Sequence, residues 1–473
     1  MHYRLYTAVL FALALLLAAL ATAHAQFDVH IYDTDGVPPS VYRQRRERVL
    51  QALSPRTAMV LPSADVRNRQ NDVDYEYRQN SNLLYLSGFP YAGGALLLSN
   101  DGLTLNGVLR HEVLFVRERK RDREVWTGVE MGPREAQNLL AIDTALPASD
   151  LLSVLETALA NVDTLIIPTL PTKLIPLPLV GVNLYVGDVL KEKLQEKFPK
   201  LTVKYDPSVL AAMREVKDEH EIRLLQRAID VSIEGHLAAM GVTKPGIHEY
   251  QIEAAMEYTF RDRGAEDVGY PSIVGSSYNA CILHYTSNRK QTNAGELVLA
   301  DCGAEYRGYT ADITRTWPVT GRFTNDQRTI YNVVLEAQDS GIAACKAGAP
   351  FSAPHQAALD VIKKRLLELG VISSPTEAQR YFMHGTSHYL GLDVHDPGTR
   401  GPLKPGTVLT VEPGIYIPSG SPCDKRWWNI GIRIEDDIVV TPNGPVNMSS
   451  KLPRAAAEIE ALVGTTPKLP QPR

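Results

Sequence analysis

The sequence is poor in the residues on which several protein classes depend. Its 473 residues include only four cysteines, which are too few to form a disulfide scaffold for a chain of this size. Export would permit a disulfide bond, but we favour the interpretation that the four cysteines are small buried residues; they are Cys281, Cys302, Cys345 and Cys423. The formal net charge is -5, so no basic surplus exists to neutralise phosphates. We therefore expect no nucleic-acid partner.

Long apolar runs are also scarce, and the clearest one lies at the N-terminus. Arg4 precedes an apolar stretch from Ala8 to Ala21, and Ala23-His24-Ala25 follows it. This order of charge, apolar run and small residues is typical of a signal peptide. A membrane anchor is the alternative, but the run falls short of the roughly 20 residues that a spanning helix needs. We predict a signal peptide over residues 1–25, export to the periplasm or the medium, and no membrane association after cleavage.

What remains has the composition of an ordinary globular protein, with 44% apolar and 22% charged residues, and is long enough for two domains. Residues 26–206 alternate β-rich apolar runs with helical stretches, which predicts an α/β domain. A second domain is expected over residues 207–464, and a disordered Pro-rich tail over 465–473. Asp218, with Glu221 three residues later, predicts the start of its first long helix. Further helices are expected over residues 324–346 and 353–369.

Two aspartates in the second domain stand on either side of a turn. Asp301 ends the apolar run LVLA, and Asp312 follows the turn-like segment Tyr306-Arg307-Gly308. A hairpin there would make the two aspartates near cross-strand neighbours. Carboxylates that close repel each other unless a proton or a cation lies between them. The pair therefore suggests a metal site, although turn-flanking aspartates without such a role are common.

Three of the 12 histidines fall within one short window, at His384, His388 and His395. A single histidine is more often a core residue, but a cluster in a Gly-containing segment favours a functional site. Glu412 ends the strand-like run VLTVE before Pro413, which stops or bends a strand.

Charged residues also alternate with apolar ones in the segment GIRIEDDIVV. Alternation places Arg433 and Glu435 on one face of this strand. Either the strand is a solvent-facing edge, or it points these charges into a site, because such charges are costly in a plain core. Two Asp, two Glu and one His together form an oxygen-rich set that can hold two divalent ions. Mn²⁺ suits these ligands best, and Zn²⁺, Co²⁺ or Fe²⁺ are feasible.

Four segments resemble the signature blocks of the pita-bread metallopeptidases, and within them the bacterial Xaa-Pro aminopeptidases (aminopeptidase P). The segments are GELVLADCGAEYRGYTADITRTWPV, MHGTSHYLGLDVHD, TVEPGIYI and GIRIEDDIVV. The segment DYEYRQNSNLLYLSGF is similar to the N-terminal domain of that family. The resemblance implies an α/β (α+β) protein, with a creatinase-like N-terminal domain followed by a pita-bread catalytic domain. It also implies a homo-oligomer, a dimer or a tetramer.

The same resemblance implies a role for each matching residue. Five positions match the metal ligands of the family, and Asp312 and Glu435 match its bridging pair: Asp301, Asp312, His388, Glu412 and Glu435. His284 and His395 match histidines that contact substrate and stabilise the transition state, and Glu412 is placed to transfer a proton. His384 matches a residue of the proline-side pocket, and Arg433 and Tyr416 match supporting residues. One departure is Thr386, where the family commonly has leucine, so the resemblance implies the ligands but not the fine shape of the pocket beside His384.

The activity implied is hydrolysis of the bond between an N-terminal residue and a penultimate proline, by hydroxide held between two metal ions. A prolidase, which cleaves only dipeptides, has the same ligands. Methionine aminopeptidases resemble the second half only, and a binding protein with this fold would be expected to lose ligands.

A serine hydrolase would use different chemistry. The segment from Gly385 to Tyr389 nearly matches G-x-S-x-G, but Tyr389 replaces the last glycine. The zinc-protease pattern HExxH is missing as well. We therefore expect a metal-dependent aminopeptidase rather than a serine enzyme.

Overall fold

The computed structural model describes residues 33–105, 107–168, 174–177, 179 and 181–465, which form two compact units. Of these described residues, the first unit comprises those up to 166 and those of 188–204, and the second comprises those of 167–187 and 205–465. The predicted signal peptide lies outside the described residues, as does the predicted tail apart from its first residue. Among the helices that are described, none has the length and apolarity needed to cross a membrane.

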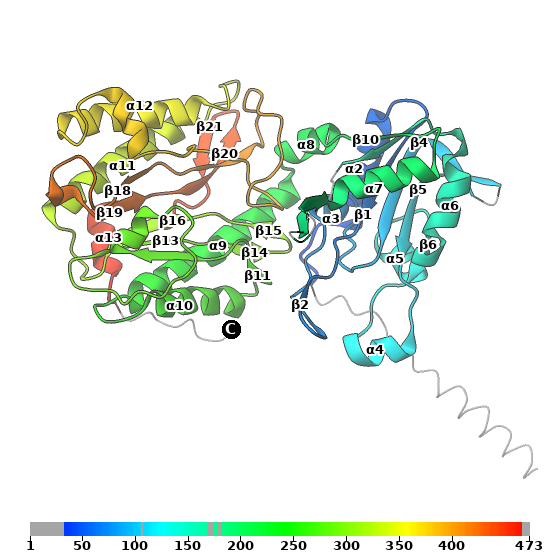
Figure 1. The fold of residues 1–473 in the computed structure, drawn as a ribbon, viewed down its shortest axis with the longest axis horizontal. Coiled ribbons are helices and arrows are strands. Elements are labelled where there is room, and N and C mark those ends of the chain that lie inside the picture. Colours follow the sequence, from blue (N-terminus) through cyan, green and yellow to red (C-terminus); the bar gives the residue numbers. More distant parts are fainter. Residues whose placement is uncertain (1–32, 106, 169–173, 178, 180, 466–473) are drawn as a thin grey trace, which may run out of the picture. The chain divides into compact units, whose positions relative to one another are not determined.

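The first unit is built on a mixed six-stranded sheet with the strand order β10-β7-β1-β4-β5-β6 (Figure 1). These strands are β1 (Thr57–Pro62), β4 (Ala95–Leu105), β5 (Val108–Val116), β6 (Ala145–Pro147), β7 (Thr164–Ile167) and β10 (Thr202–Tyr205). A small hairpin of this unit pairs β2 (Asn68–Gln70) with β3 (Val73–Asp74). A second hairpin, β8 (Leu174–Leu177) with β9 (Val182–Tyr185), lies in the stretch 167–187 that groups with the second unit. The helices are α2 (Pro39–Ala52), α3 (Ser81–Ser87), α4 (Arg121–Thr127), α5 (Pro133–Leu139), α6 (Leu151–Ala158) and α7 (Val186–Lys197).

Helix α2 is held to this sheet by a buried ion pair. The Arg46 guanidinium donates to the Glu112 carboxylate of β5 at 2.6 Å, and both side chains are almost fully enclosed. Arg46 also donates to the Leu86 carbonyl at the end of α3. Strands and helices alternate along this unit, as predicted for an α/β domain.

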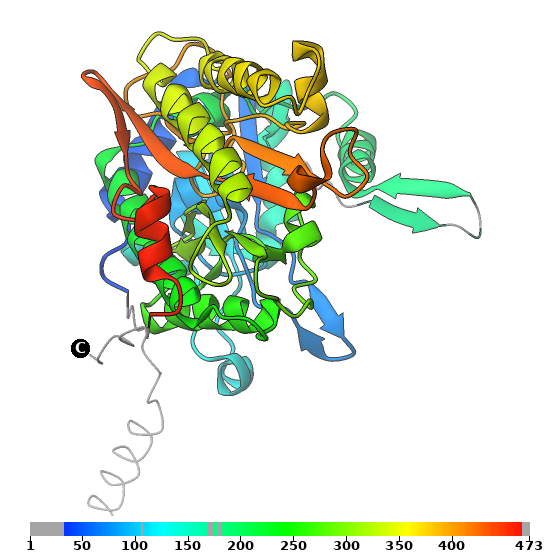
Figure 2. The same ribbon diagram turned by 90° about the vertical axis from the view of Figure 1, so that its left-hand side faces the viewer.

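The helices of the second unit are α8 (Ser208–Glu215), α9 (Glu219–Val242), α10 (Glu249–Asp262), α11 (Asn325–Ala344), α12 (Ala353–Glu368) and α13 (Ala456–Leu462). The Asp218 side chain accepts hydrogen bonds from the amides of His220 and Glu221. The Glu221 carboxylate in turn accepts one from the Asp218 amide, so the predicted capping box starts α9. The predictions of the two later helices are confirmed by α11 and α12. Within this unit, α9 and α10 lie on one side of the strands and α11 and α12 on the other (Figures 1 and 2).

Four small antiparallel sheets lie between these helices. Their orders are β12-β13-β16, β17-β20-β21, β18-β19 and β11-β14-β15. The strands are β11 (Asp267–Val268), β12 (Ile273–Ser276), β13 (Leu297–Asp301), β14 (Ala304–Tyr306), β15 (Tyr309–Thr310), β16 (Thr314–Pro318), β17 (Val408–Val411), β18 (Gly414–Ile417), β19 (Ile430–Arg433), β20 (Asp436–Thr441) and β21 (Gly444–Asn447). The short 3-10 helix η4 (Ser277–Cys281) packs on β19.

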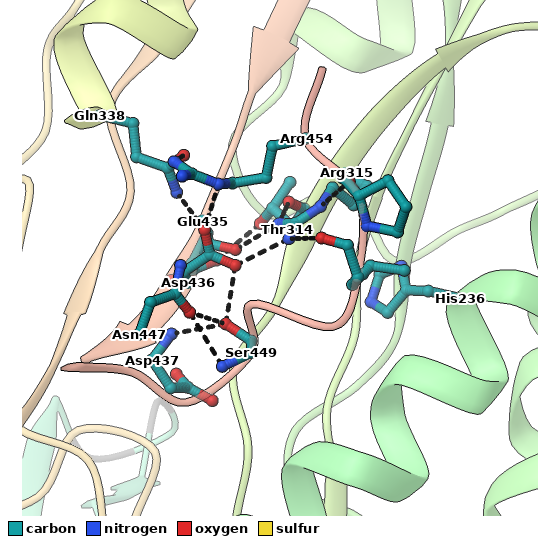
Figure 3. A network of polar contacts seen from close by, with 12 residues as sticks. His236, Thr314, Arg315, Gln338, Glu435, Asp436, Asp437, Asn447, Ser449 and Arg454 are labelled. Carbon is teal, nitrogen blue, oxygen red and sulfur yellow. Dashed lines mark hydrogen bonds and ion pairs between the residues drawn. The ribbon is translucent and has the colours of Figure 1, made fainter. Parts of the chain in front are cut away.

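A buried polar network joins the sheet of β16 to the sheet of β20 (Figure 3). The Arg315 guanidinium donates to the Glu435 carbonyl at 2.6 Å and to the Asp436 carboxylate at 2.7 Å, and neither charged side chain is exposed. Ser449 donates to the same Asp436 carboxylate. A buried charge is tolerated only when it is paired and hydrogen-bonded, so this network fixes the position of β16, which follows Asp312, relative to β20, which follows Glu435.

Candidate metal centre and active site

A tight turn brings the two predicted aspartates together. Arg307 and Gly308 both have positive φ (52° and 80°), as a two-residue hairpin turn between β14 and β15 requires. In the pairing of β13 with β16, Asp301 lies opposite Thr314. Asp312 is therefore a diagonal neighbour of Asp301, on the same face, rather than its direct partner. The carboxylates are close enough for the Tyr270 hydroxyl to contact both, at 2.6 and 2.5 Å.

His388 lies in an irregular segment and points at the acidic residues. Its Nδ1 lies 3.1 Å from the Tyr389 carbonyl, so Nδ1 donates a proton there and Nε2 is the ring nitrogen that faces the acidic residues. That Nε2 lies 3.4 Å from the Asp312 carboxylate and 3.5 Å from that of Glu412. Ligand atoms of Asp312, His388 and Glu435 all lie within 4.8 Å of one another. A backbone carbonyl that orients an imidazole in this way is usual beside metal ligands.

The two glutamates come from the ends of different strands. Glu412 follows β17, and its amide donates to the Thr386 carbonyl at 2.9 Å. Glu435 precedes β20 and accepts a hydrogen bond of 2.6 Å from the Thr314 hydroxyl. Only 1% of Glu435 and 3% of Arg433 is exposed, so a solvent-facing edge, one of the two readings of this strand, is wrong. The charges point into a site.

The electrostatics of this cluster favour a bound cation. Burial and the neighbouring Asp301 raise the pKa of Asp312. Burial, reinforced by Asp312 and Glu412, raises the pKa of Glu435 well above its usual range. Burial also raises the pKa of Glu412 to about 7. Closely spaced buried carboxylates resist ionisation together, and divalent cations would relieve that repulsion. The oxygen-rich donor set with one imidazole therefore fits such ions.

The cluster opens into a cleft of about 720 Å³. The lining of this cleft includes His284, Asp301, His384, His388, His395, Glu412 and Arg433. The His395 ring lies edge-on to that of His388, with centroids 4.4 Å apart. Burial, together with His388 and His284, lowers the pKa of His395, which favours its neutral form.

A chain of hydrogen bonds connects the cluster to His384. Arg433 donates to the Asp301 carboxylate at 2.5 Å and to the Tyr416 hydroxyl at 2.9 Å. Tyr416 lies 2.9 Å from His384 Nε2, and His384 Nδ1 lies 2.7 Å from the Gly385 carbonyl. Nδ1 therefore donates to the carbonyl, and Nε2 accepts from the tyrosine. The structure brings every predicted site residue to this one region.

Comparison with known proteins identifies the family. Residues 223–442 match the model of metallopeptidase family M24, and residues 42–167 match the aminopeptidase P N-terminal domain. The chain is 36% identical to Xaa-Pro aminopeptidase of Escherichia coli, over 89% of this chain and 97% of the relative. It is 34% identical to Xaa-Pro aminopeptidase of Haemophilus influenzae, over 90% and 98%. The chain belongs to the Xaa-Pro aminopeptidase family of M24 metallopeptidases.

Solved structures of this family share the fold. Aminopeptidase PepP of Pseudomonas aeruginosa superposes with a TM-score of 0.81 at 33% identity, covering 91% of this chain and 98% of that one. Zinc-substituted aminopeptidase P of E. coli, in complex with product, gives a TM-score of 0.80 at 34% identity, covering 90% and 98%. The predicted architecture, an N-terminal domain followed by a pita-bread catalytic domain, is confirmed. Membership of the M24 family also implies divalent metal ions.

Sequence reasoning missed Tyr270 and the contact that His355 makes with Thr386. Tyr270, whose hydroxyl bridges Asp301 and Asp312, lies in the segment VGYPS, which shows no spacing that marks it. The departure at Thr386 also has a structural counterpart. Its hydroxyl is fully buried and lies 2.9 Å from Nδ1 of His355 on α12. Phe382 lies between the His355 and His384 rings, with centroids 5.5 and 5.0 Å away.

The geometry also disfavours the serine hydrolase. The buried Ser387 hydroxyl has no hydrogen-bond partner among the described residues. A serine nucleophile needs a base within hydrogen-bond reach, so the side chain lacks the arrangement that this chemistry requires.

Proposed function

We propose that this protein hydrolyses the bond between the N-terminal residue of a peptide and a proline in second position, using two divalent ions, preferably Mn²⁺. One observation carries the proposal: Asp301, Asp312, His388, Glu412 and Glu435 converge beside a single cleft. Asp312 and Glu435 are the proposed bridging ligands. When bound, such an ion pair supplies Lewis acidity and activates water near neutral pH.

The residues of the chain would bind and orient the peptide and move its protons. The carboxylate of Glu412 would accept the proton of the attacking water and deliver it to the leaving proline nitrogen. His284 and His395 line the cleft, where either would donate to the oxyanion that develops on the scissile carbonyl. His384, oriented by Tyr416, would contact the proline ring. Because a bond to proline lacks an N–H, recognition of the ring replaces recognition of that group.

Location and assembly belong to the same proposal. The signal-like residues 1–25 support export, with activity in the periplasm or the medium. We also propose that the protein is a homo-oligomer, a dimer or a tetramer. Sedimentation of the mature chain would measure its oligomeric state.

Hydrolysis of the tripeptide Arg-Pro-Pro by the chelator-stripped mature chain tests the activity. Release of arginine only after Mn²⁺ is added would support the proposal, and equal assays with Zn²⁺, Co²⁺ and Fe²⁺ rank the metals. Cleavage of Arg-Pro without cleavage of the tripeptide would indicate a prolidase instead. Cleavage that needs no metal would contradict the assigned site.

A further inference from the structure

His284 lies on an exposed loop and depends on that loop for its position. Between η4 and β13, residues 282–296 contain no helix and no strand. His284 is exposed, yet it lines the same cleft as the candidate ligands Asp301, His388 and Glu412. A donor to an oxyanion works only when it is held in place before the reaction. The loop therefore needs an anchor.

One buried carboxylate accepts hydrogen bonds from this loop and from the segment that leads into it. Glu249, the first residue of α10, is 0% exposed. Its Oε1 accepts from the Ser276 amide at 2.6 Å, the Ser276 hydroxyl at 2.7 Å and the Asn279 side-chain amide at 3.2 Å. Its Oε2 accepts from the Tyr285 hydroxyl and from the Lys290 amide, both at 2.9 Å. Five donors from one segment converge on one side chain.

The geometry of this anchor requires a carboxylate. Two oxygens with about four lone-pair sites are needed to accept these hydrogen bonds. Glutamine has a single oxygen, so its NH₂ group would face either the Ser276 or the Lys290 amide. Donor would then oppose donor, and buried N–H groups would lose their acceptor.

We propose that Glu249 is a positioning residue that holds His284 at the cleft through Tyr285 and Lys290 of the loop and through the segment that precedes it. This inference rests on the proposed function, because His284 matters there as an oxyanion donor. Glu249 itself is not among the residues that line the cleft. It acts through the loop and not on the substrate.

The decisive experiment is a double-mutant cycle on Arg-Pro-Pro hydrolysis. Removing an oxyanion donor costs about 10²–10³ in kcat, so we expect Glu249→Gln to lower kcat at least about tenfold, with KM changed less than about twofold. In a His284→Ala background the same substitution should have almost no further effect, because coupled residues are not additive. An equal loss in both backgrounds would overturn the proposal.

Glu460→Gln is the matched control. Glu460 is also a buried carboxylate that accepts a backbone amide, that of Phe323, together with the side chains of Arg322 and Arg328. It anchors no residue of the cleft, so this variant should lose stability while kcat stays within about twofold of wild type. A kcat loss equal to that of Glu249→Gln would mean that general destabilisation explains both variants.

A gentler variant and a readout without substrate complete the test. Tyr285→Phe removes only the hydroxyl that donates to Glu249 from the residue that follows His284, and we expect a smaller loss of kcat in the same direction. Amide hydrogen exchange of peptides spanning residues 277–290 should accelerate in Glu249→Gln and stay unchanged in Glu460→Gln. Unchanged exchange in Glu249→Gln would refute the anchor even if the proposed activity were absent. An inactive wild type with accelerated exchange would refute the activity alone.

Discussion

Replacing Asp396 should destabilise the catalytic unit more than replacing any exposed acidic residue nearby. Asp396 follows His395, and its carboxylate accepts from the Arg214 guanidinium and, at 3.1 Å, from the Lys217 ammonium. The three side chains are only 1%, 3% and 1% exposed. Burial lowers the pKa of Arg214, but Asp396 and Asp393 outweigh it and raise that pKa above its usual value. Two buried cations therefore depend on one buried carboxylate.

The structure sets the expected magnitude for Asp396→Ala. Removing one partner of a buried pair costs about 3–5 kcal/mol. For a unit of this size, 1 kcal/mol shifts Tm by about 2–4 °C, so the unfolding transition of the catalytic unit should fall by roughly 6–20 °C. Turnover should fall as well, because the segment that carries His395 loses its attachment to α8.

Asp393→Ala is the control, measured by the same differential scanning calorimetry. Asp393 also pairs with Arg214, at 2.7 Å, but its side chain is 41% exposed. Exposed pairs contribute about 0–1 kcal/mol, so its Tm should fall by less than about 4 °C. If Asp396→Ala unfolds at the same temperature as Asp393→Ala, the reasoning from burial is wrong.

Three further predictions concern the metal site, a pH dependence and the Thr386 contact. Asp312→Ala should reduce Arg-Pro-Pro turnover to below a few per cent of wild type even with saturating Mn²⁺, and higher residual activity would argue against a dinuclear mechanism. Burial raises the pKa of Glu460, but the Phe323 amide and the Arg328 guanidinium outweigh it and lower that pKa. Its stabilisation is therefore present above about pH 4.3, the usual glutamate value, and is lost as the pH falls through the lower folded value. The Tm gap between wild type and Glu460→Gln should accordingly narrow in acid, and a gap that widens there would contradict the assignment. Thr386→Val removes the hydroxyl that contacts His355 with little change in side-chain volume. It should lower the free energy of unfolding by about 1–3 kcal/mol, measured by calorimetry. An unchanged Tm would show that water replaces the hydroxyl.

The sequence predicted those parts of the structure that depend on local signals. The capping box at Asp218 begins α9, and the turn at Arg307-Gly308 places Asp301 beside Asp312, because both features are specified within a few residues. The exact register was not predictable. Asp301 and Asp312 were expected to be near cross-strand neighbours, and the pairing makes them diagonal neighbours.

Contacts between distant residues were beyond sequence reasoning. Tyr270 reaches Asp312 across 42 positions, and Glu249 reaches Lys290 across 41. Neither Tyr270 nor Glu249 lies in a sequence pattern whose periodicity or spacing predicts such a contact. Burial separates the two readings of the segment containing Glu435, since alternation alone fits an edge strand as well as a site.

The buried network between β16 and β20 also has a consequence for biosynthesis. Thr314 and Arg315 contact Glu435 and Asp436, which are translated about 120 residues later. When the chain has been translated past Arg315 but not yet to Glu435, the Arg315 guanidinium has no acidic partner from β20. At that stage the candidate metal site has only part of its ligands. The candidate site is therefore complete only after Glu435 has been translated, and a chain that stops before Glu435 lacks it.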